Sequence, residues 1–296
     1  MCFAFSLGCI CKSAPFSTYN FCAKVLLMLC KKLHSNEKCY MMEFIKMKLS
    51  TKNVALIAVF AALYYVLSLI TPYIPAVAIP EIKISLEALI ASVYGLVLGP
   101  YLGALASFLG AFVTWTLPPA SMSPYGMPFL LSPPLNALIT GLIFYRKWKT
   151  GFFIYAILII AFLFTPPVQP ISENLYVGVA VLWDKIIALL LILPCAKFAE
   201  QLAASKSLPF LYFLLTFIGN QVDNMWGSLV FATPTVYEGI FGLSVDTVRF
   251  LFVVSPFVYP AIRLLQAIIA TVVAVPLMKA IIDTPWVWQE KNILSP

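Results

Sequence analysis

Long apolar segments alternate with short polar or proline-containing breaks from residue 46 to the end of the chain. The segments run over residues 54–70, 86–98, 101–117, 129–145, 152–164, 175–193, 208–231 and 257–282. A helix needs about 20 residues to cross a bilayer, so the two 13-residue segments must extend into their flanks or lie buried among neighbours. The pattern predicts an all-α fold, a polytopic membrane helical bundle with six to eight transmembrane helices.

Basic residues near the segment ends indicate how the chain crosses the membrane. If eight segments cross and both termini lie inside, ten basic residues fall on the inner edges and two on the outer loops. The inner residues are Lys46, Lys48, Lys52, Arg146, Lys147, Lys149, Lys197, Lys206, Lys279 and Lys291, and the outer residues are Lys83 and Arg249. Basic residues stay on the cytoplasmic side during insertion. The distribution favours eight crossings, or a loss of crossings in pairs, and predicts a multi-pass protein of the cell membrane with both termini in the cytoplasm.

Proline and glycine mark the breaks between segments. Proline removes a backbone donor, so these positions are expected to be loops or kinks. The outer loops 71–85, 118–128 and 232–256 are long enough to fold over an opening between helices, where they would serve as lids. Glycines in the segments 86–98 and 101–117, together with Gly99 between them, predict close packing of these two segments against each other.

Composition supports the membrane assignment. Hydrophobic residues make up 62% of the 296 residues and charged residues 10%, whereas an ordinary soluble domain is about 25% charged. The net charge of +7 is concentrated at the start of the chain, since residues 1–41 contribute +4 of it. The remaining charge lies at membrane edges, so no nucleic-acid partner is expected.

Residues 1–41 differ from the rest of the chain. Six of the seven cysteines lie there, but their spacing is unlike that of a zinc site, and no run has the pattern of a secretory signal. We interpret residues 1–41 as a poorly ordered, cysteine-rich leader, either translated from a mis-assigned start or forming a cytoplasmic arm. Residues 42–296 are predicted to form the transmembrane helical domain.

Four ionisable residues lie inside the apolar segments: Asp184, Lys185, Asp223 and Arg263. A charge in the hydrocarbon costs at least about 2.5 kcal/mol, so such residues are candidates for function. At about 1.5 Å per residue, Asp184, Asp223 and Arg263 all fall in the outer half of the membrane in the predicted topology.

Helical spacing adds polar neighbours to these charges. Residues three or four apart share a helix face, which predicts a pocket for a polar or zwitterionic small molecule. The predicted substrate-binding residues are Asn220, Asp223, Asn224, Trp226, Tyr259, Arg263, Gln266, Asp184 and Lys185, with Glu173 and Asn174 above them. The alternative is that the acids and bases pair as structural ion pairs. Asp184 and Lys185 are adjacent, so both cannot point squarely at one ligand.

Several catalytic motifs are absent from the sequence. It contains no phosphate-binding loop, no His-Glu-x-x-His, no Gly-x-Ser-x-Gly and no histidine after His34. The chain is therefore not expected to hydrolyse ATP itself, to be an enzyme, or to need a metal or cofactor. A secondary carrier, a membrane enzyme using carboxylates and a scaffold protein remain as alternatives, although no internal repeat typical of carriers is visible.

The order of the motifs resembles the substrate-binding (S) component of an energy-coupling factor (ECF) transporter. The resemblance rests on the alanine-rich segment 54–67, the proline-bearing loop to Glu87, the string ASVYGLVLGPYLGA over residues 91–104, the Pro128-Phe129 turn, and RLLQAIIA over 263–270. It covers most of residues 50–282. Six helices are usual in that family, and the surplus here is expected in the region 152–193.

The resemblance implies capture of a vitamin or similar micronutrient at the outer face. The partners that it implies are a transmembrane coupling (T) protein, two ATPase subunits and the lipid bilayer in which the subunit reorients. Ala58 and Ala62, in a small-residue stripe with Ala55, match the motif that contacts the coupling protein. Thiamine, riboflavin, biotin, a queuosine precursor and an amino acid all remain open as the solute.

Overall fold

A computed structural model describes residues 50–70, 74–76, 79–84, 89–118, 120–204, 207–281 and 284. These residues all belong to one unit, Ser50–Pro296. The predicted leader 1–41, with its six cysteines, lies outside the described residues, and so does the predicted start of the transmembrane domain at residue 42.

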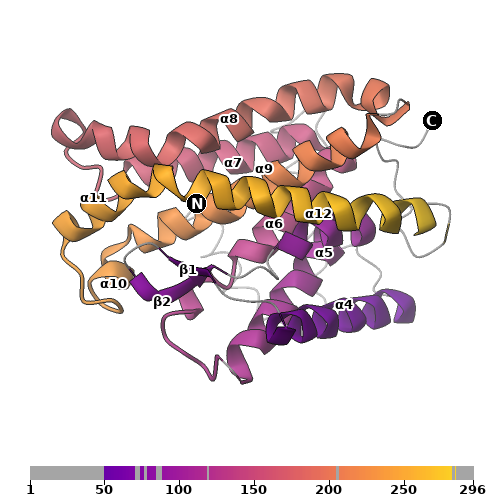
Figure 1. The fold of residues 1–296 in the computed structure, drawn as a ribbon, viewed down its shortest axis with the longest axis horizontal. Helices are drawn as coiled ribbons and strands as arrows, with labels where there is room; N and C mark the ends of the chain where they lie inside the picture. The colour runs from indigo at the N-terminus through magenta and orange to yellow at the C-terminus, as the bar shows by residue number, and fades with distance from the viewer. Residues whose placement is uncertain are drawn as a thin grey trace, which may run out of the picture. The chain divides into compact units, whose positions relative to one another are not determined.

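The described residues form a bundle of apolar helices (Figure 1). Its long elements are α4 (Thr51–Ile70), α5 (Ile90–Thr116), α6 (Ser132–Phe144), α7 (Trp148–Leu163), α8 (Ile171–Ala204), α9 (Leu208–Phe231) and α12 (Tyr259–Ile281). The short elements are β1 (Ile74–Ala76), β2 (Ile79–Ile84), η3 (Met127–Phe129), α10 (Pro234–Tyr237), α11 (Val245–Val254) and η4 (Ser255–Phe257). The prediction of an all-α polytopic membrane bundle is confirmed.

Five stretches of the described chain are both long and apolar enough to cross a membrane. They are Thr51–Ile70, Ile90–Thr116, Met127–Phe144, Ile171–Phe198 and Tyr259–Ile281. The helix α7, at 16 residues, is shorter. The helix α9 has 24 residues but is not among the five, because its amide and acid side chains lower its mean hydropathy. The predicted number of six to eight crossings stays a prediction.

The segments predicted at 86–98 and 101–117 are two arms of α5 that meet at Gly99 and Pro100. Gly99 has φ 81° and ψ 173°, a conformation that favours glycine. A Cβ on Gly103 would lie 2.6 Å from the carbonyl oxygen of Tyr94, nine residues earlier. In a straight helix these positions would be about 13 Å apart, so the chain folds back at Gly99 and the two arms pack against each other.

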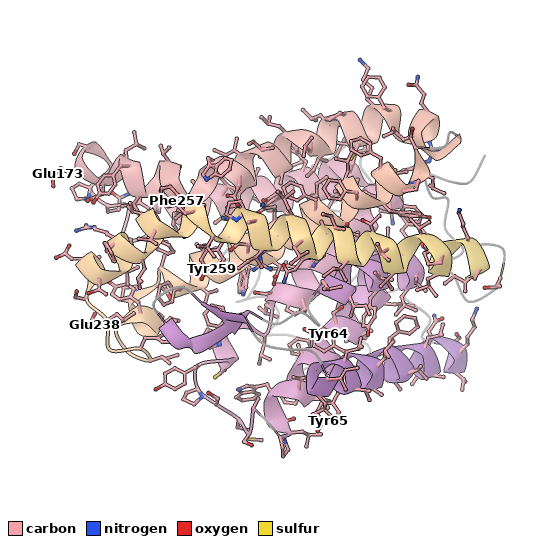
Figure 2. All side chains as sticks on the ribbon, in the orientation of Figure 1. Tyr64, Tyr65, Glu173, Glu238, Phe257 and Tyr259 are labelled. Atoms are coloured by element: carbon pink, nitrogen blue, oxygen red, sulfur yellow. The ribbon has the colours of Figure 1, made fainter. Side chains whose placement is uncertain are left out.

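The helix α9 occupies the centre of the bundle and α4 its edge. α9 packs against α6, α8 and α12, and nearly every side chain from Leu211 to Met225 is buried. α4 packs mainly against α5, where Gly110 makes room for the ring of Tyr64. In Figure 2, Tyr64 lies on the side of α4 that faces the bundle.

The short elements gather toward one end of the bundle, at the left of Figure 1. β1 and β2 pair in antiparallel fashion, with Ile74 opposite Ile84. The prediction that 71–85 and 232–256 are loops was therefore wrong in part. The first range contains these strands, and the second contains α10 and α11. Figure 2 places Glu173 and Glu238 at the same end. The prediction that this end is the outer one remains untested.

Candidate functional site: a buried polar cluster around α9

One face of α9 carries the polar residues at the centre of the bundle. Asn220, Asp223 and Asn224 follow one another at helical spacing, and Gln221 lies beside them. All four side chains are buried. Because buried polar groups need hydrogen-bond partners, the residues of α6, α8 and α12 that pack against this face decide what it can do.

Arg263 of α12 supplies the main partner. Its Nη1 donates to Asp223 Oδ2 at 2.8 Å and to Gln266 Oε1 at 2.8 Å. The Ser132 hydroxyl of α6 also hydrogen-bonds the Asp223 carboxylate. The side chains of Arg263 and Asp223 are 9% and 7% exposed. This is the pairing that the structural alternative predicted, and it neutralises two charges that would be costly if either were buried alone.

The helix α6 contributes an amide pair that sequence reasoning missed. Asn136 Nδ2 donates to Asn220 Oδ1 at 3.0 Å, and Thr140 Oγ1 donates to Asn136 Oδ1 at 3.3 Å. A Cβ on Gly219 would collide with both Asn136 and Thr140, so the glycine makes room for this contact. The sequence signal was present: Asn136 and Thr140 are four residues apart inside an otherwise apolar segment.

The helix α8 places Asp184 and Lys185 in the interior as well. Lys185 Nζ donates to Asp184 Oδ1 at 3.0 Å, and both side chains are 5% exposed. The two neighbours thus pair with each other, which fits the expectation that they cannot both face one ligand. Taken with Asp223 and Arg263, the buried charged side chains of the described chain are two acids and two bases, and their charges cancel.

Polar atoms without partners remain around these pairs. In the described part of the chain, the buried side-chain atoms that lack a hydrogen bond are Ser107 Oγ, Tyr155 Oη, Asp184 Oδ2, Asn220 Nδ2, Gln221 Nε2 and Oε1, Asn224 Nδ2 and Arg263 Nε. Each unsatisfied buried group costs about 1–3 kcal/mol, and more if charged. Six of these atoms belong to Asn220, Gln221, Asn224, Arg263 and Asp184, so the cluster has spare capacity for a hydrogen-bonding ligand.

The predicted aromatic residues lie nearer the end of the bundle. Trp226 is half-buried, and its Nε1 donates to the carbonyl oxygen of Pro128 in η3 at 3.4 Å. Tyr259 is half-buried at the start of α12, one helical turn before Arg263 (Figure 2). They are therefore positioned between the polar cluster and the short elements α10 and α11.

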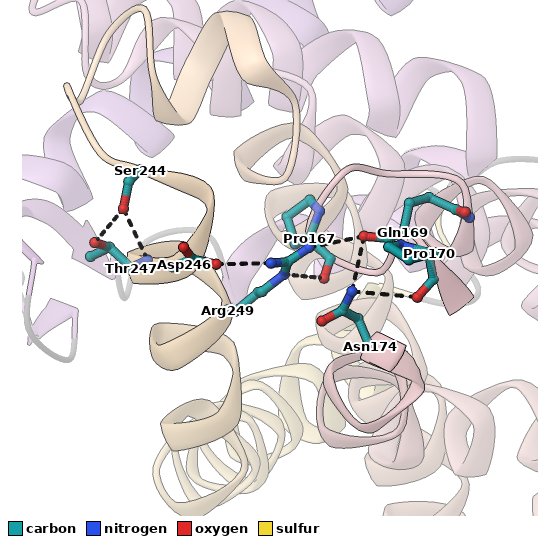
Figure 3. A network of polar contacts seen from close by, with 8 residues as sticks. All are labelled: Pro167, Gln169, Pro170, Asn174, Ser244, Asp246, Thr247 and Arg249. Carbon is teal, nitrogen blue, oxygen red and sulfur yellow. Dashed lines mark hydrogen bonds and ion pairs between the residues drawn. The ribbon is translucent and has the colours of Figure 1, made fainter. Parts of the chain in front are cut away.

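A separate network ties α11 to the turn between α7 and α8 (Figure 3). Arg249 donates to the carbonyl oxygens of Pro167 at 3.1 Å and Gln169 at 2.9 Å, and its Nη1 pairs with Asp246 at 2.8 Å. The predicted pocket residue Asn174, near the start of α8, contacts this turn, because its Nδ2 donates to Gln169 O at 3.0 Å. Glu173 is exposed at this end of the bundle.

The predicted partner-interface residues lie on the outside of α4. Ala58 and Ala62 are exposed, as is Ala55, whereas Ala61 is buried against α5. The side chains of α4 that turn inward are Ile57, Ala61, Tyr64 and Ser68, which form a single narrow stripe. The small-residue stripe thus faces away from the bundle.

No group of three or more histidine, cysteine, aspartate or glutamate side chains with metal-binding geometry occurs among the described residues. The buried acids each have one basic partner, Lys185 for Asp184 and Arg263 for Asp223. The chemistry of the cluster is that of hydrogen bonding and charge pairing.

The geometry is that of a helical membrane protein with a closed polar core. Residues 48–188, slightly less than half of the chain, match the model of the family "ECF-type riboflavin transporter, S component". The match supports the resemblance seen in the sequence: over these residues the chain is similar to the S component of an ECF transporter, a membrane subunit that binds a small-molecule substrate. Comparison with curated proteins and with solved structures gave no match.

The matched segment runs from just before α4 into the middle of α8. It contains Ala58, Ala62, Asp184 and Lys185, while α9 and α12, which carry Asp223 and Arg263, follow it. The family match therefore supports the class of the protein. The site on α9 and α12 is supported by its own geometry.

Proposed function

We propose that this protein captures a riboflavin-like solute within the polar cluster around α9 and delivers it through a coupling protein and two ATPase subunits. The observation that carries the proposal is the set of unsatisfied buried polar atoms beside the Asp223–Arg263 ion pair. A cluster built only for stability would be expected to satisfy its own hydrogen bonds.

The charge balance of the cluster favours a neutral solute. Among the described residues, two buried acids and two buried bases cancel each other, so a ligand with a net charge would find no unpaired counter-charge among them. The unsatisfied atoms of Asn220, Asn224 and Arg263 are all N–H donors. They complement a planar heterocycle whose ring nitrogens and carbonyl oxygens accept hydrogen bonds, as in a flavin.

The half-buried aromatic residues fit the same kind of solute. Trp226 follows Asp223 and Asn224 along α9 in the direction of α10, and Tyr259 lies one helical turn before Arg263 at the start of α12. Aromatic rings stack on flat heterocycles, so these residues provide an apolar wall beside the donors. We infer that the solute enters from the end of the bundle where the short elements gather and that the exposed Ala58 and Ala62 of α4 contact the coupling protein from outside.

The proposal is tested by titrating the purified protein with riboflavin and following the quenching of flavin fluorescence. Saturable quenching with one site per chain is expected, and native mass spectrometry of the gently purified protein should detect a carried-over molecule of the same mass. Thiamine and biotin serve as competitors of different shape. Tight binding of one of these, with no binding of riboflavin, would contradict the riboflavin-like assignment.

A second measurement separates this function from the alternatives. The protein alone in liposomes is expected to give no net uptake under an ion gradient, whereas cells that also produce the coupling protein and ATPases should accumulate the solute. Ion-driven uptake by the chain alone would indicate a secondary carrier. Conversion of the bound flavin to a product of different mass would indicate an enzyme.

A further inference from the structure

A second group of buried polar side chains lies where α7 and α8 meet. Tyr155 of α7 is completely buried, and Asp184 and Lys185 of α8 are nearly so. Lys185 uses one oxygen of the Asp184 carboxylate, at 3.0 Å. The other oxygen, Oδ2, and the Tyr155 hydroxyl have no hydrogen-bond partner in the described part of the chain.

These groups share one electrostatic environment with each other and with the first cluster. The charge of Asp184 acts on Tyr155, and the charge of Arg263 acts on Lys185. The helices α7 and α8 pack against each other, and both pack against α9. Buried polar side chains therefore occur on each of the neighbouring helices α7, α8, α9 and α12.

The chemistry at the α7–α8 end differs from that around α9. A carboxylate oxygen only accepts hydrogen bonds, and a tyrosine hydroxyl both donates and accepts. Lys185 already neutralises Asp184, so a cation is not needed there. An alcohol can donate to the Asp184 Oδ2 oxygen, and it can also accept from or donate to the Tyr155 hydroxyl. A chain with hydroxyl groups on neighbouring carbons would satisfy both.

We infer that Tyr155 and Asp184 form a subsite for the hydroxylated chain of the solute, separate from the donors around Arg263 that recognise its ring. This inference rests on the proposed function. Tyr155 and Asp184 both lie inside the segment 48–188 that matches the riboflavin transporter family, and riboflavin carries such a chain on its ring.

The test compares riboflavin with lumiflavin, which has the same ring but a methyl group in place of the hydroxylated chain. Both are titrated against the wild type, Tyr155→Phe, and the double variant Asp184→Asn with Lys185→Met, which leaves no unpaired charge. We expect each variant to weaken riboflavin binding by about tenfold or more, the effect of losing one or two hydrogen bonds. Lumiflavin binding should change by less than about twofold.

Tyr145→Phe is the matched control. It also removes one buried tyrosine hydroxyl, but this hydroxyl donates to the carbonyl oxygen of Leu96 at 2.8 Å. It should leave the ratio of the two dissociation constants unchanged. If Tyr155→Phe and the double variant also leave this ratio unchanged while both flavins bind, the subsite is wrong and the proposed function stands. If the wild type binds neither flavin, the proposed function fails and the subsite fails with it.

Discussion

The helices α9 and α4 use apolar residues in opposite ways. α9 lies at the centre, and its buried side chains include Asn220, Gln221, Asp223 and Asn224. α4 lies at the edge, turns only the stripe Ile57, Ala61, Tyr64 and Ser68 inward, and exposes most of its apolar residues. In water this arrangement would be inside out. In a bilayer it is expected, because lipid solvates the apolar face of α4, and polar side chains in membrane proteins face the interior of the bundle, where functional sites lie.

This contrast indicates which helix is expected to serve which function. A substitution in the polar interior of α9 should alter solute binding. A substitution on the exposed face of α4 should alter only the contact with the coupling protein. The five predictions below test this division, in order of the expected effect on solute binding.

Removing Arg263 is expected to have the largest effect. Arg263→Ala leaves the Asp223 carboxylate buried without its cation, and breaking such a pair costs about 3–5 kcal/mol. Riboflavin binding should weaken by at least about a hundredfold, as measured by fluorescence titration.

The double variant Asp223→Asn with Arg263→Gln separates folding from recognition. It removes both charges together, so the protein should remain folded and monodisperse in detergent. It should still bind riboflavin much more weakly than the wild type. Wild-type affinity in the double variant would mean that the ion pair is purely structural.

Filling the space at Gly219 should have an intermediate effect. A Cβ there would collide with Asn136 and Thr140, so Gly219→Ala should displace the amide pair and lower the free energy of unfolding by about 1–3 kcal/mol. Thermal unfolding and riboflavin titration both report the change. Gly227→Ala on the same helix is the control, because its Cβ would meet only Phe129, at 3.9 Å.

Asp246→Asn should have a small effect. Asp246 pairs with Arg249 at 2.8 Å, as Asp223 does with Arg263, but its side chain is 82% exposed. Exposed pairs contribute about 0.2–1 kcal/mol and weaken with salt, and Arg249 keeps its bonds to Pro167 and Gln169. The melting temperature should fall slightly at low ionic strength. A loss of binding as large as that of Arg263→Ala would contradict the distinction between the two pairs.

Enlarging Ala58 and Ala62 should leave solute binding unchanged. Both residues are exposed on α4, so Ala58→Leu with Ala62→Leu should alter the free energy of unfolding by no more than about 0.5 kcal/mol. Uptake in cells that contain the coupling protein should nevertheless be lost, because the bulkier face prevents close helix packing. Ala61→Leu is the contrast, since Ala61 is buried against α5 and should destabilise the subunit itself.

Much of the bundle could be predicted from the sequence because hydrophobic runs determine helix positions in a membrane. The segment predicted at 208–231 coincides with α9, and the break at Gly99 and Pro100 is where α5 folds back. The pairing of Asp223 with Arg263, 40 residues apart, was one of the two outcomes that their shared depth allowed. Charges buried in hydrocarbon have few ways to be satisfied.

The rest depended on lateral helix contacts, which periodicity does not reveal. Asn136 was missed because the sequence does not say that α6 faces Asn220. The helices α10 and α11 were missed because they are short and lie between proline-rich breaks. Close packing and interhelical hydrogen bonds determine which helices are neighbours in lipid, and neither can be identified without the three-dimensional structure.

The separation of Asp223 from Arg263 along the chain has a consequence for biogenesis. Arg263 lies 40 residues after Asp223 in the chain, so α9 is made well before its arginine partner reaches the membrane, and α9 is not among the described helices that are long and apolar enough to cross a membrane. We therefore expect the stable insertion of α9 to depend on α12, so a chain truncated before Arg263 should hold α9 in the bilayer less stably than the full chain does.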